Sequence, residues 1–242
     1  MSFWSGEHIT AVALVAVIAV AVTITARARP GRWIPVVCRV LAVTLLLTEP
    51  AYWLQQVVRH AWSSGTDLPF QLSDAAVFAG AAALWWRTRM LVELTYFWGF
   101  GAVLQALVTP DLAEHFPDPR FVLFYLSHGA VMVAALMLTV GLRMPPRPGA
   151  LWRVFAITLG FTIAVGLIDI ATSSNYMYLR SKPVGGSLLN FMGPWPWYIG
   201  SGLLLALLVL MALNAPFWIS RRRDDSSLCF APTRRSRTGG DR

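Results

Sequence analysis

The chain has 242 residues, of which 56% are hydrophobic and 13% charged, and its mean hydropathy is +0.57. Too few polar side chains remain to cover a soluble globule of this size, so lipid is predicted to solvate much of the surface. The formal net charge of +8 does not indicate nucleic-acid binding, because most basic residues are Arg that flank hydrophobic runs. No disulfide is expected, since Cys38 falls in a hydrophobic run and Cys229 in the charged tail.

Seven stretches are apolar and long enough to cross the hydrocarbon core, which takes about 20 residues per helix. In chain order they are Ile9–Ala26, Ile34–Val57, Leu68–Trp86, Leu91–Val108, Phe121–Leu142, Leu151–Thr172 and Trp197–Ile219. The first follows MSFWSGEH, which has no positive charge, and is therefore expected to stay as an anchor rather than act as a signal peptide. The sequence predicts an all-α bundle of seven transmembrane helices over residues 1–219.

The distribution of Arg predicts how this bundle is oriented. Basic residues gather after the first, third, fifth and seventh stretches, which all fall on one side and should face the cytoplasm. The other connections are poorer in basic residues, with Arg59, Arg120, Arg180 and Lys182 as the exceptions. We therefore expect the N-terminus outside and a basic, disordered tail over residues 220–242 inside. Abundant Arg and Ala with a single Lys are typical of a high-GC bacterial genome, which predicts a multi-pass protein of the bacterial cell membrane.

Polar and ionisable side chains inside the stretches are costly in lipid, so each marks a candidate site. Six of them fall near the outer leaflet when depth is counted from the ends of the stretches: Glu49, Ser73, Asp74, Gln105, His128 and Asp169. Each alone also has a structural explanation, such as helix packing for Ser73 or a favourable helix dipole for Asp74. Their shared depth is what favours a common site.

Three of these residue types are the parts of an acyl-transfer site. Ser73 is the candidate nucleophile, His128 the base, and Asp74 or Glu49 the group that orients the base. No GxSxG, HExxH, CxxC or nucleotide-binding glycine motif is present, so neither a metal nor another cofactor is predicted. A non-catalytic protein that binds lipid or transports a small solute through the same cavity remains the alternative.

Four phrases carry a resemblance to a known family: LPFQLSD at 68–74, ELTYFWGFGAVLQALVTPDL at 93–112, FYLSHG at 124–129, and NYMYLRSKP with MGPWPWYI between 175 and 199. Together they resemble the YwaF-like bacterial integral membrane proteins, whose animal relative is transmembrane protein 164. That relative is an acyltransferase that moves a fatty acyl chain onto a lyso ether phospholipid, with a Cys and a His as proposed catalytic residues. The resemblance implies that His128 is this His and that Ser73 stands where the relative has its Cys.

The predicted depth of the polar residues suits a lipid substrate, because acyl chains can enter sideways while an ester reaches the polar groups. Membrane lipids are therefore the expected partners, and the sequence leaves the oligomeric state open. Residues in the same layer are candidates for substrate binding: Gln105, Asp169, Asn175, Tyr176, Arg180 and Lys182. Of these, Arg180 and Lys182 are expected to attract a phosphate.

Overall fold

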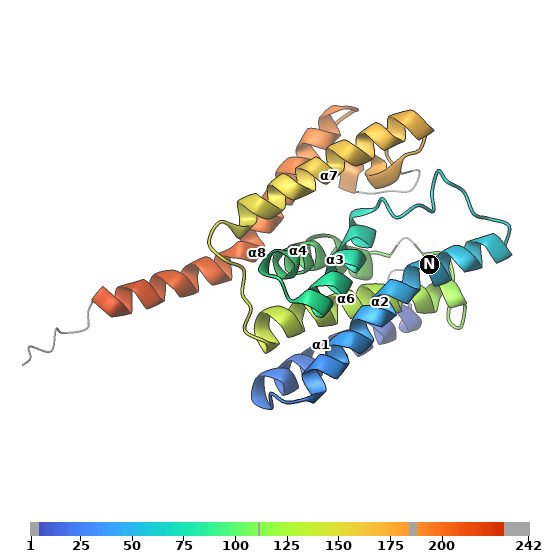
Figure 1. Cartoon of the computed structure of the whole chain (residues 1–242). Helices are drawn as coiled ribbons and strands as arrows, with labels where there is room; N and C mark the ends of the chain where they lie inside the picture. The colour runs from blue at the N-terminus through green and yellow to red at the C-terminus, as the bar shows by residue number, and fades with distance from the viewer. Residues whose placement is uncertain (1–4, 111, 184–187, 230–242) are drawn as a thin grey trace, which may run out of the picture.

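The structure is a computed structural model that describes residues 5–110, 112–183 and 188–229, with side chains described to residue 221. Every regular element within these ranges is helical (Figure 1). The helices are α1 (Gly6–Ala28), α2 (Trp33–Val58), α3 (Leu72–Trp86), α4 (Arg89–Trp98), α5 (Leu104–Val108), α6 (Pro119–Leu136), α7 (Ala150–Thr172) and α8 (Trp197–Cys229). The π-helical segments η1 (Gly99–Val103) and η2 (Met137–Gly141) join α4 to α5 and extend α6, and η3 (Tyr176–Tyr178) and η4 (Leu188–Phe191) are short 3₁₀ turns.

Six of the helical segments are apolar and long enough to cross a membrane, with α4, η1 and α5 counted as one. The seventh, α3, has 15 residues and is about 22 Å long, which is shorter than the roughly 30 Å hydrocarbon core. It begins four residues later than the sequence predicts, because Gln71 is extended and its backbone N–H bonds the Asp74 carboxylate at 2.9 Å. The prediction of an all-α polytopic membrane protein is confirmed.

Helix α8 continues to Cys229, ten residues past the predicted end of the last stretch at Ile219. The disordered tail was predicted to begin at residue 220, whereas the helical backbone covers the first part of that segment. Residues 230–242 lie outside the described part of the chain. The orientation of the bundle and the boundary at residue 220 stay predictions.

The first helix packs against α6, more than 100 residues away in the sequence. At one end of α1, His8 Nδ1 lies 2.6 Å from the Tyr125 hydroxyl, and at the other end Arg27 donates to the Val140 carbonyl at 3.1 Å. Between them the helices approach so closely that a Cβ on Gly129 would lie 2.7 Å from Val15. A small residue is therefore required at position 129, as is common where membrane helices cross.

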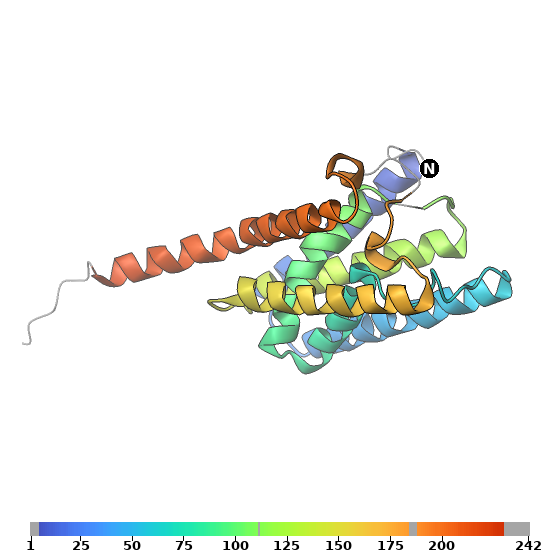
Figure 2. The same ribbon diagram turned by 90° about the horizontal axis from the view of Figure 1, so that it is seen from above.

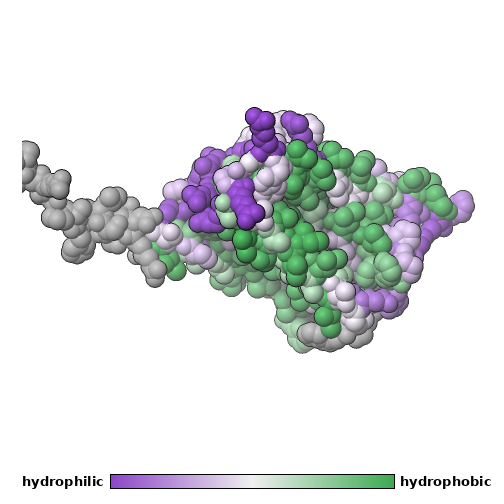
Figure 3. Space-filling view, turned by 90° about the horizontal axis from the view of Figure 1, so that it is seen from below, coloured by the Kyte–Doolittle hydropathy of each residue, from purple (hydrophilic) through white to green (hydrophobic). Residues whose placement is uncertain are grey.

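Helices α3, α4 and α6 form the buried centre of the bundle, while α7 and α8 lie to one side of it (Figures 1 and 2). In Figure 2 the end of α8 extends well beyond the other helices. The surface in Figure 3 shows an apolar band between two polar ends, as expected for helices whose sides face lipid. The chain passes along the bundle seven times. The amino-terminal end of α1 and the carboxyl-terminal end of α8 therefore lie at opposite ends of the bundle.

A buried carboxylate joins three segments at the end of the bundle where α4 and α7 begin. The Glu93 side chain is 1% exposed, and both of its oxygens accept hydrogen bonds from Arg147 and Arg153. The shortest of these distances are 2.8 Å to Arg147 and 2.9 Å to Arg153. Arg147 lies in the connection to α7, where the Glu93 carboxylate holds the pKa of its guanidinium above the ordinary value. This ion pair fixes α4 to the start of α7.

Candidate functional site

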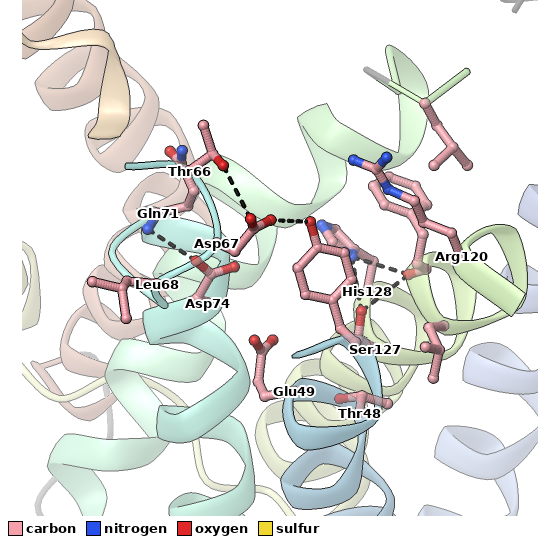
Figure 4. Close-up of a pocket in the computed structure, with 14 residues that line it drawn as sticks. Thr48, Glu49, Thr66, Asp67, Leu68, Gln71, Asp74, Arg120, Ser127 and His128 are labelled. Atoms are coloured by element: carbon pink, nitrogen blue, oxygen red, sulfur yellow. Dashed lines mark hydrogen bonds between the residues drawn. The ribbon is translucent and has the colours of Figure 1, made fainter. Parts of the chain in front are cut away.

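A polar cavity of about 180 Å³ lies at the other end of the bundle, between the end of α2 and the starts of α3 and α6 (Figure 4). The connection between α2 and α3 closes one of its walls. The lining residues are Thr48, Glu49, Tyr52, Thr66, Asp67, Leu68, Gln71, Asp74, Leu112, Arg120, Leu123, Phe124, Ser127 and His128. Three of the four predicted catalytic residues, Glu49, Asp74 and His128, are therefore brought together.

The Glu49 carboxylate enters this cavity from α2 without a hydrogen-bond donor among the described residues (Figure 4). Pro50 follows it within the helix, and proline has no N–H to donate to the carbonyl of Leu46 one turn earlier. Thr48 uses its hydroxyl to bond the Leu45 carbonyl at 2.8 Å. A carboxylate without a fixed partner is a group that a substrate or a transient positive charge can engage.

His128 lies on α6 with one ring nitrogen anchored by the backbone. Its Nδ1 is 3.0 Å from the Phe124 carbonyl oxygen, which can only accept, so Nδ1 carries the proton of the neutral ring. The Ser127 hydroxyl is also 3.0 Å from Nδ1, and the Phe124 ring stacks on the imidazole at 4.2 Å between centroids. Nε2 has no partner among the described residues and retains a lone pair, which is the arrangement of a general base.

The hydroxyl groups in the cavity wall are already engaged as donors. Thr48 bonds the Leu45 carbonyl, Ser127 bonds the Phe124 carbonyl at 3.1 Å, and Tyr52 bonds the Asp67 carboxylate at 2.8 Å. The fourth, Thr66, bonds the same carboxylate at 3.1 Å. The lining therefore supplies a base and carboxylates. Each of its own hydroxyl groups already donates its proton to an acceptor within the protein.

Asp67 organises the wall between α2 and α3. Besides Tyr52 and Thr66, its carboxylate accepts from the Ser63 backbone N–H at 2.8 Å and from the Gln56 amide at 3.0 Å. Burial alone raises the pKa of this carboxyl, but the hydrogen bonds from Ser63, Gln56, Tyr52 and Thr66 together lower it below its ordinary value. The ionised form of Asp67 is thus the form that holds the wall.

This network predicts a pH dependence of stability. A carboxyl whose pKa is lower when folded contributes stability above the unfolded pKa, about 3.9, and loses it as pH falls through the folded value. We expect the thermal unfolding temperature of wild type in detergent to fall below about pH 4, and Asp67→Asn to have a lower unfolding temperature at neutral pH. The two unfolding temperatures should converge in acid. A constant difference between them down to the lowest pH would contradict this role.

The connection that follows α7 braces the same wall from outside. The Tyr176 hydroxyl accepts from the Leu68 N–H at 3.0 Å and donates to the Ser64 carbonyl at 2.8 Å. Nearby, the Met177 N–H donates to Gln71 Oε1 at 3.1 Å. Since Leu68 and Gln71 line the cavity, Tyr176 positions the wall without reaching the cavity itself.

Removing the Tyr176 hydroxyl is expected to loosen this wall. In Tyr176→Phe the Leu68 N–H loses its acceptor and the Ser64 carbonyl loses a donor, which costs about 1–3 kcal/mol of unfolding free energy. Limited proteolysis within residues 61–71 should become faster while the rest of the chain keeps its wild-type cleavage rate. Tyr96→Phe is the comparison variant, because the Tyr96 hydroxyl donates to the Leu213 carbonyl at 3.1 Å and not to this wall. Equally fast cleavage of residues 61–71 in that variant would mean that the hydroxyl of Tyr176 has no special part.

The remaining predicted residues lie away from the cavity lining. Ser73 is in the first turn of α3, next to Asp74 but not itself among the lining residues, and Gln105 is exposed on α5. Asp169 is fully buried, and its Oδ1 accepts from the Tyr176 N–H at 2.9 Å and the Ser174 hydroxyl at 2.7 Å. These contacts order the connection after α7.

Three further predicted binding residues belong to that connection. The Asn175 side chain accepts from the Arg180 and Ser181 N–H groups at 2.9 and 3.0 Å. The Arg180 guanidinium donates to the Asp169 carbonyl at 3.2 Å, and the Lys182 ammonium lies 5.4 Å from the centre of the Tyr198 ring. Their contacts are with the protein, and none of them lines the cavity.

Sequence reasoning missed several residues that do line the cavity. Arg120 is the most informative, because the sequence already marked it as an exception, an Arg on the side predicted to be poor in basic residues. Its guanidinium bonds Glu114 at 2.8 Å and lies 5.8 Å from the centre of the Tyr52 ring. Ser127 stands beside His128 in the sequence, so its proximity to the imidazole was open to prediction. Among the described residues, no group of three His, Cys, Asp or Glu is placed to hold a metal ion.

Comparison with known proteins identifies a family for most of the chain. The model of the TMEM164 family matches residues 3–213, which include all seven membrane segments except the end of α8. The chain belongs to the TMEM164 family. No curated protein and no solved structure matches it. Membership in the TMEM164 family confirms the predicted relationship to transmembrane protein 164, while the bacterial YwaF-like branch stays a prediction.

Proposed function

We propose that this protein transfers acyl chains between ester lipids at the outer end of the bundle, in the bacterial cell membrane, with His128 as general base. The observation that carries the proposal is the hydrogen bond from His128 Nδ1 to the Phe124 carbonyl at 3.0 Å, which leaves Nε2 free on a residue that lines the cavity. An imidazole held in this tautomer can accept a proton from a hydroxyl group that enters the cavity.

The reaction needs no group beyond the two lipids and the side chains of the cavity. His128 Nε2 takes the proton of the acceptor hydroxyl, whose oxygen attacks the ester carbonyl carbon of the donor. The tetrahedral intermediate then expels the donor alkoxide, which receives the proton back from His128, so that a new ester and a lysolipid leave. Glu49 and Asp74 face the same cavity, and one ionised carboxylate there stabilises the imidazolium while it holds the proton (Figure 4).

The intermediate also needs a donor for its oxyanion. The Gln71 side chain lines the cavity, and its Oε1 is engaged by the Met177 N–H, so its orientation is fixed. Its amide nitrogen donates to none of the described residues and is available for the oxyanion. A volume of about 180 Å³ holds the reacting ester and hydroxyl but is below the 300–1,000 Å³ typical of whole-ligand pockets. The acyl chains therefore extend into the surrounding lipid.

This mechanism passes the acyl group directly from donor to acceptor. The other route, a covalent ester on Ser73, follows from the family resemblance, but Ser73 is not part of the cavity lining. A direct transfer also agrees with the lining hydroxyls, each of which already donates to an acceptor.

The test uses purified full-length protein in phosphatidylcholine vesicles that contain deuterated lysophosphatidylcholine or lysophosphatidylglycerol. We expect mass spectrometry to detect deuterated diacyl lipid with wild type and with Ser73→Ala, which retains the direct route. Loss of the product in Ser73→Ala would contradict direct transfer and indicate a covalent acyl-serine intermediate. Binding of either lysolipid without any product would overturn acyl transfer and indicate the lipid-binding alternative.

A further inference from the structure

A second cavity, of about 490 Å³, opens at the opposite end of the molecule between α7 and α8. It is lined by Pro148, Gly149, Leu151, Trp152, Met211, Asn214, Ala215, Trp218 and Arg221. We call it the α7–α8 groove. None of these residues lines the cavity that contains His128. From this groove we infer a binding site for an anionic phospholipid of the leaflet at this end of the bundle.

The groove combines an apolar body with a charged end. Trp152 on α7 is 62% exposed and Met211 on α8 is 50% exposed, so both present apolar surface that acyl chains can cover. Asn214, Trp218 and Arg221 follow each other at spacings of four and three residues along α8, which places them on one helix face. Along this face the Trp218 ring comes before the Arg221 guanidinium. In a lipid lying there, the chains and ester groups likewise come before the phosphate.

Arg221 is the group that selects the charge of the ligand. One of its nitrogens donates to the Pro146 carbonyl at 3.0 Å, which fixes the side chain across the mouth of the groove while four of its five N–H groups have no described acceptor. It pairs with no described carboxylate, in contrast to Arg59, Arg120, Arg147 and Arg153. A guanidinium that has no counter-ion among the described side chains, and that lies beside an apolar groove, suits a phosphate headgroup.

Asn214 provides the second polar contact. It lies seven residues before Arg221, about 10 Å deeper in the membrane, and has no hydrogen-bond partner among the described residues. An amide at that depth needs a partner, because lipid chains offer none. The ester carbonyls of a phospholipid lie on the chain side of its phosphate and are the nearest acceptors. Trp218 lies between the two depths, where indole rings are favoured at the interface.

The occupant is an anionic diacyl lipid rather than a free anion or a second copy of this chain. A free phosphate would use Arg221 alone and leave the apolar walls exposed. The groove also lies where Arg221 is followed by Arg222 and Arg223 in the sequence, at the end of the bundle predicted to face the cytoplasm. Basic clusters just beyond a membrane helix attract anionic lipids.

The inference is tested by tryptophan quenching of the full-length protein in phosphatidylcholine vesicles. A small fraction of the lipid is replaced by phosphatidylglycerol or by phosphatidylcholine, each brominated near the ester end of its chains. The double variant Trp152→Phe, Trp218→Phe lacks both tryptophans of the groove. The difference between the wild-type fluorescence and that of the double variant is therefore the signal of the groove. We expect the brominated phosphatidylglycerol to quench this signal with about fivefold preference, and Arg221→Gln to remove that preference. Arg221→Lys should keep most of it, and Asn214→Leu should weaken quenching by both lipids.

Arg27→Gln is the matched control, because Arg27 also donates to a backbone carbonyl at 3.1 Å and is exposed at the same end of the bundle. It should keep the wild-type preference. Equal quenching by both lipids in wild type, or the same loss in Arg27→Gln, would overturn the inference. Relief of quenching by millimolar inorganic phosphate would also overturn it, because it would indicate a site for a free anion. Relief of quenching at a higher protein-to-lipid ratio would overturn it too, because it would indicate a second copy of the chain in the groove.

Discussion

Substituting His128 by Gln should lower the rate of acyl transfer at least about 100-fold, the lower end of what a general base contributes. Glutamine has nearly the same reach and polarity but cannot take a proton from the acceptor hydroxyl. Initial rates with deuterated lysolipid in vesicles measure the effect, and lipid binding should remain close to wild type. His60→Gln is the matched control, since His60 is exposed and outside the cavity lining.

The hydroxyl beside the imidazole allows a finer test of the same geometry. Ser127→Ala removes a group 3.0 Å from Nδ1 but leaves the Phe124 carbonyl as the acceptor of the Nδ1 proton. We expect a loss of about fivefold, which corresponds to one ordinary hydrogen bond of about 1 kcal/mol. A loss as large as that of His128→Gln would make Ser127 a participant in the reaction and would contradict its role as a positioning residue.

The second large effect is on stability, at the other end of the bundle. Glu93→Gln removes the charge that two guanidinium groups share and turns an amide towards their N–H donors. We expect a loss of about 2–4 kcal/mol, because a broken buried ion pair costs about 3–5 kcal/mol and the Arg partners here are partly exposed. Thermal unfolding of the purified protein in detergent measures it.

The exposed pair between Glu7 and His115 supplies the comparison. Its two side chains are 44% and 59% exposed, and Glu7→Gln should change the free energy of unfolding by less than about 1 kcal/mol. Similar losses of unfolding free energy in Glu93→Gln and Glu7→Gln would show that the burial of Glu93 does not increase its contribution to stability. Rescue of Glu93→Gln by Arg153→Leu would support the proposed cause, because the unpaired cation is then removed as well.

Hydropathy predicted the helices well, because their bounds follow from distance along the chain. The predicted stretches coincide with the helices within three residues at most ends. The two larger differences are at the start of α3 and the end of α8. The common depth of Glu49, Asp74 and His128 was visible in the sequence for the same reason, and the three residues do share a cavity.

The sequence did not predict in which direction each side chain points around its helix axis. Gln105 has the right depth but faces outward, and it follows the π-helical segment Gly99–Val103. Such a segment inserts an extra residue into the turn and shifts every later side chain around the axis, so that regular α-helical spacing misplaces the face of Gln105. Asp169 and Asn175 lie at the same end of the bundle as the cavity, but their partners are backbone and serine groups of an irregular connection, and no periodic pattern predicts those.

The contact between the first helix and α6 has a consequence for how the chain is made. Val15 packs on Gly129, and His8 on Tyr125, so the final neighbour of α1 emerges from the ribosome about 100 residues after it. At 5–20 residues per second this interval lasts roughly 5–20 s. During that time the newly inserted α1 has no permanent partner, and the polar side chains of Glu7 and His8, the second of which is buried in the folded structure, must stay at the membrane surface. The insertion machinery therefore has to keep the first helix near the channel, or allow it to return, until α6, the fifth segment, arrives.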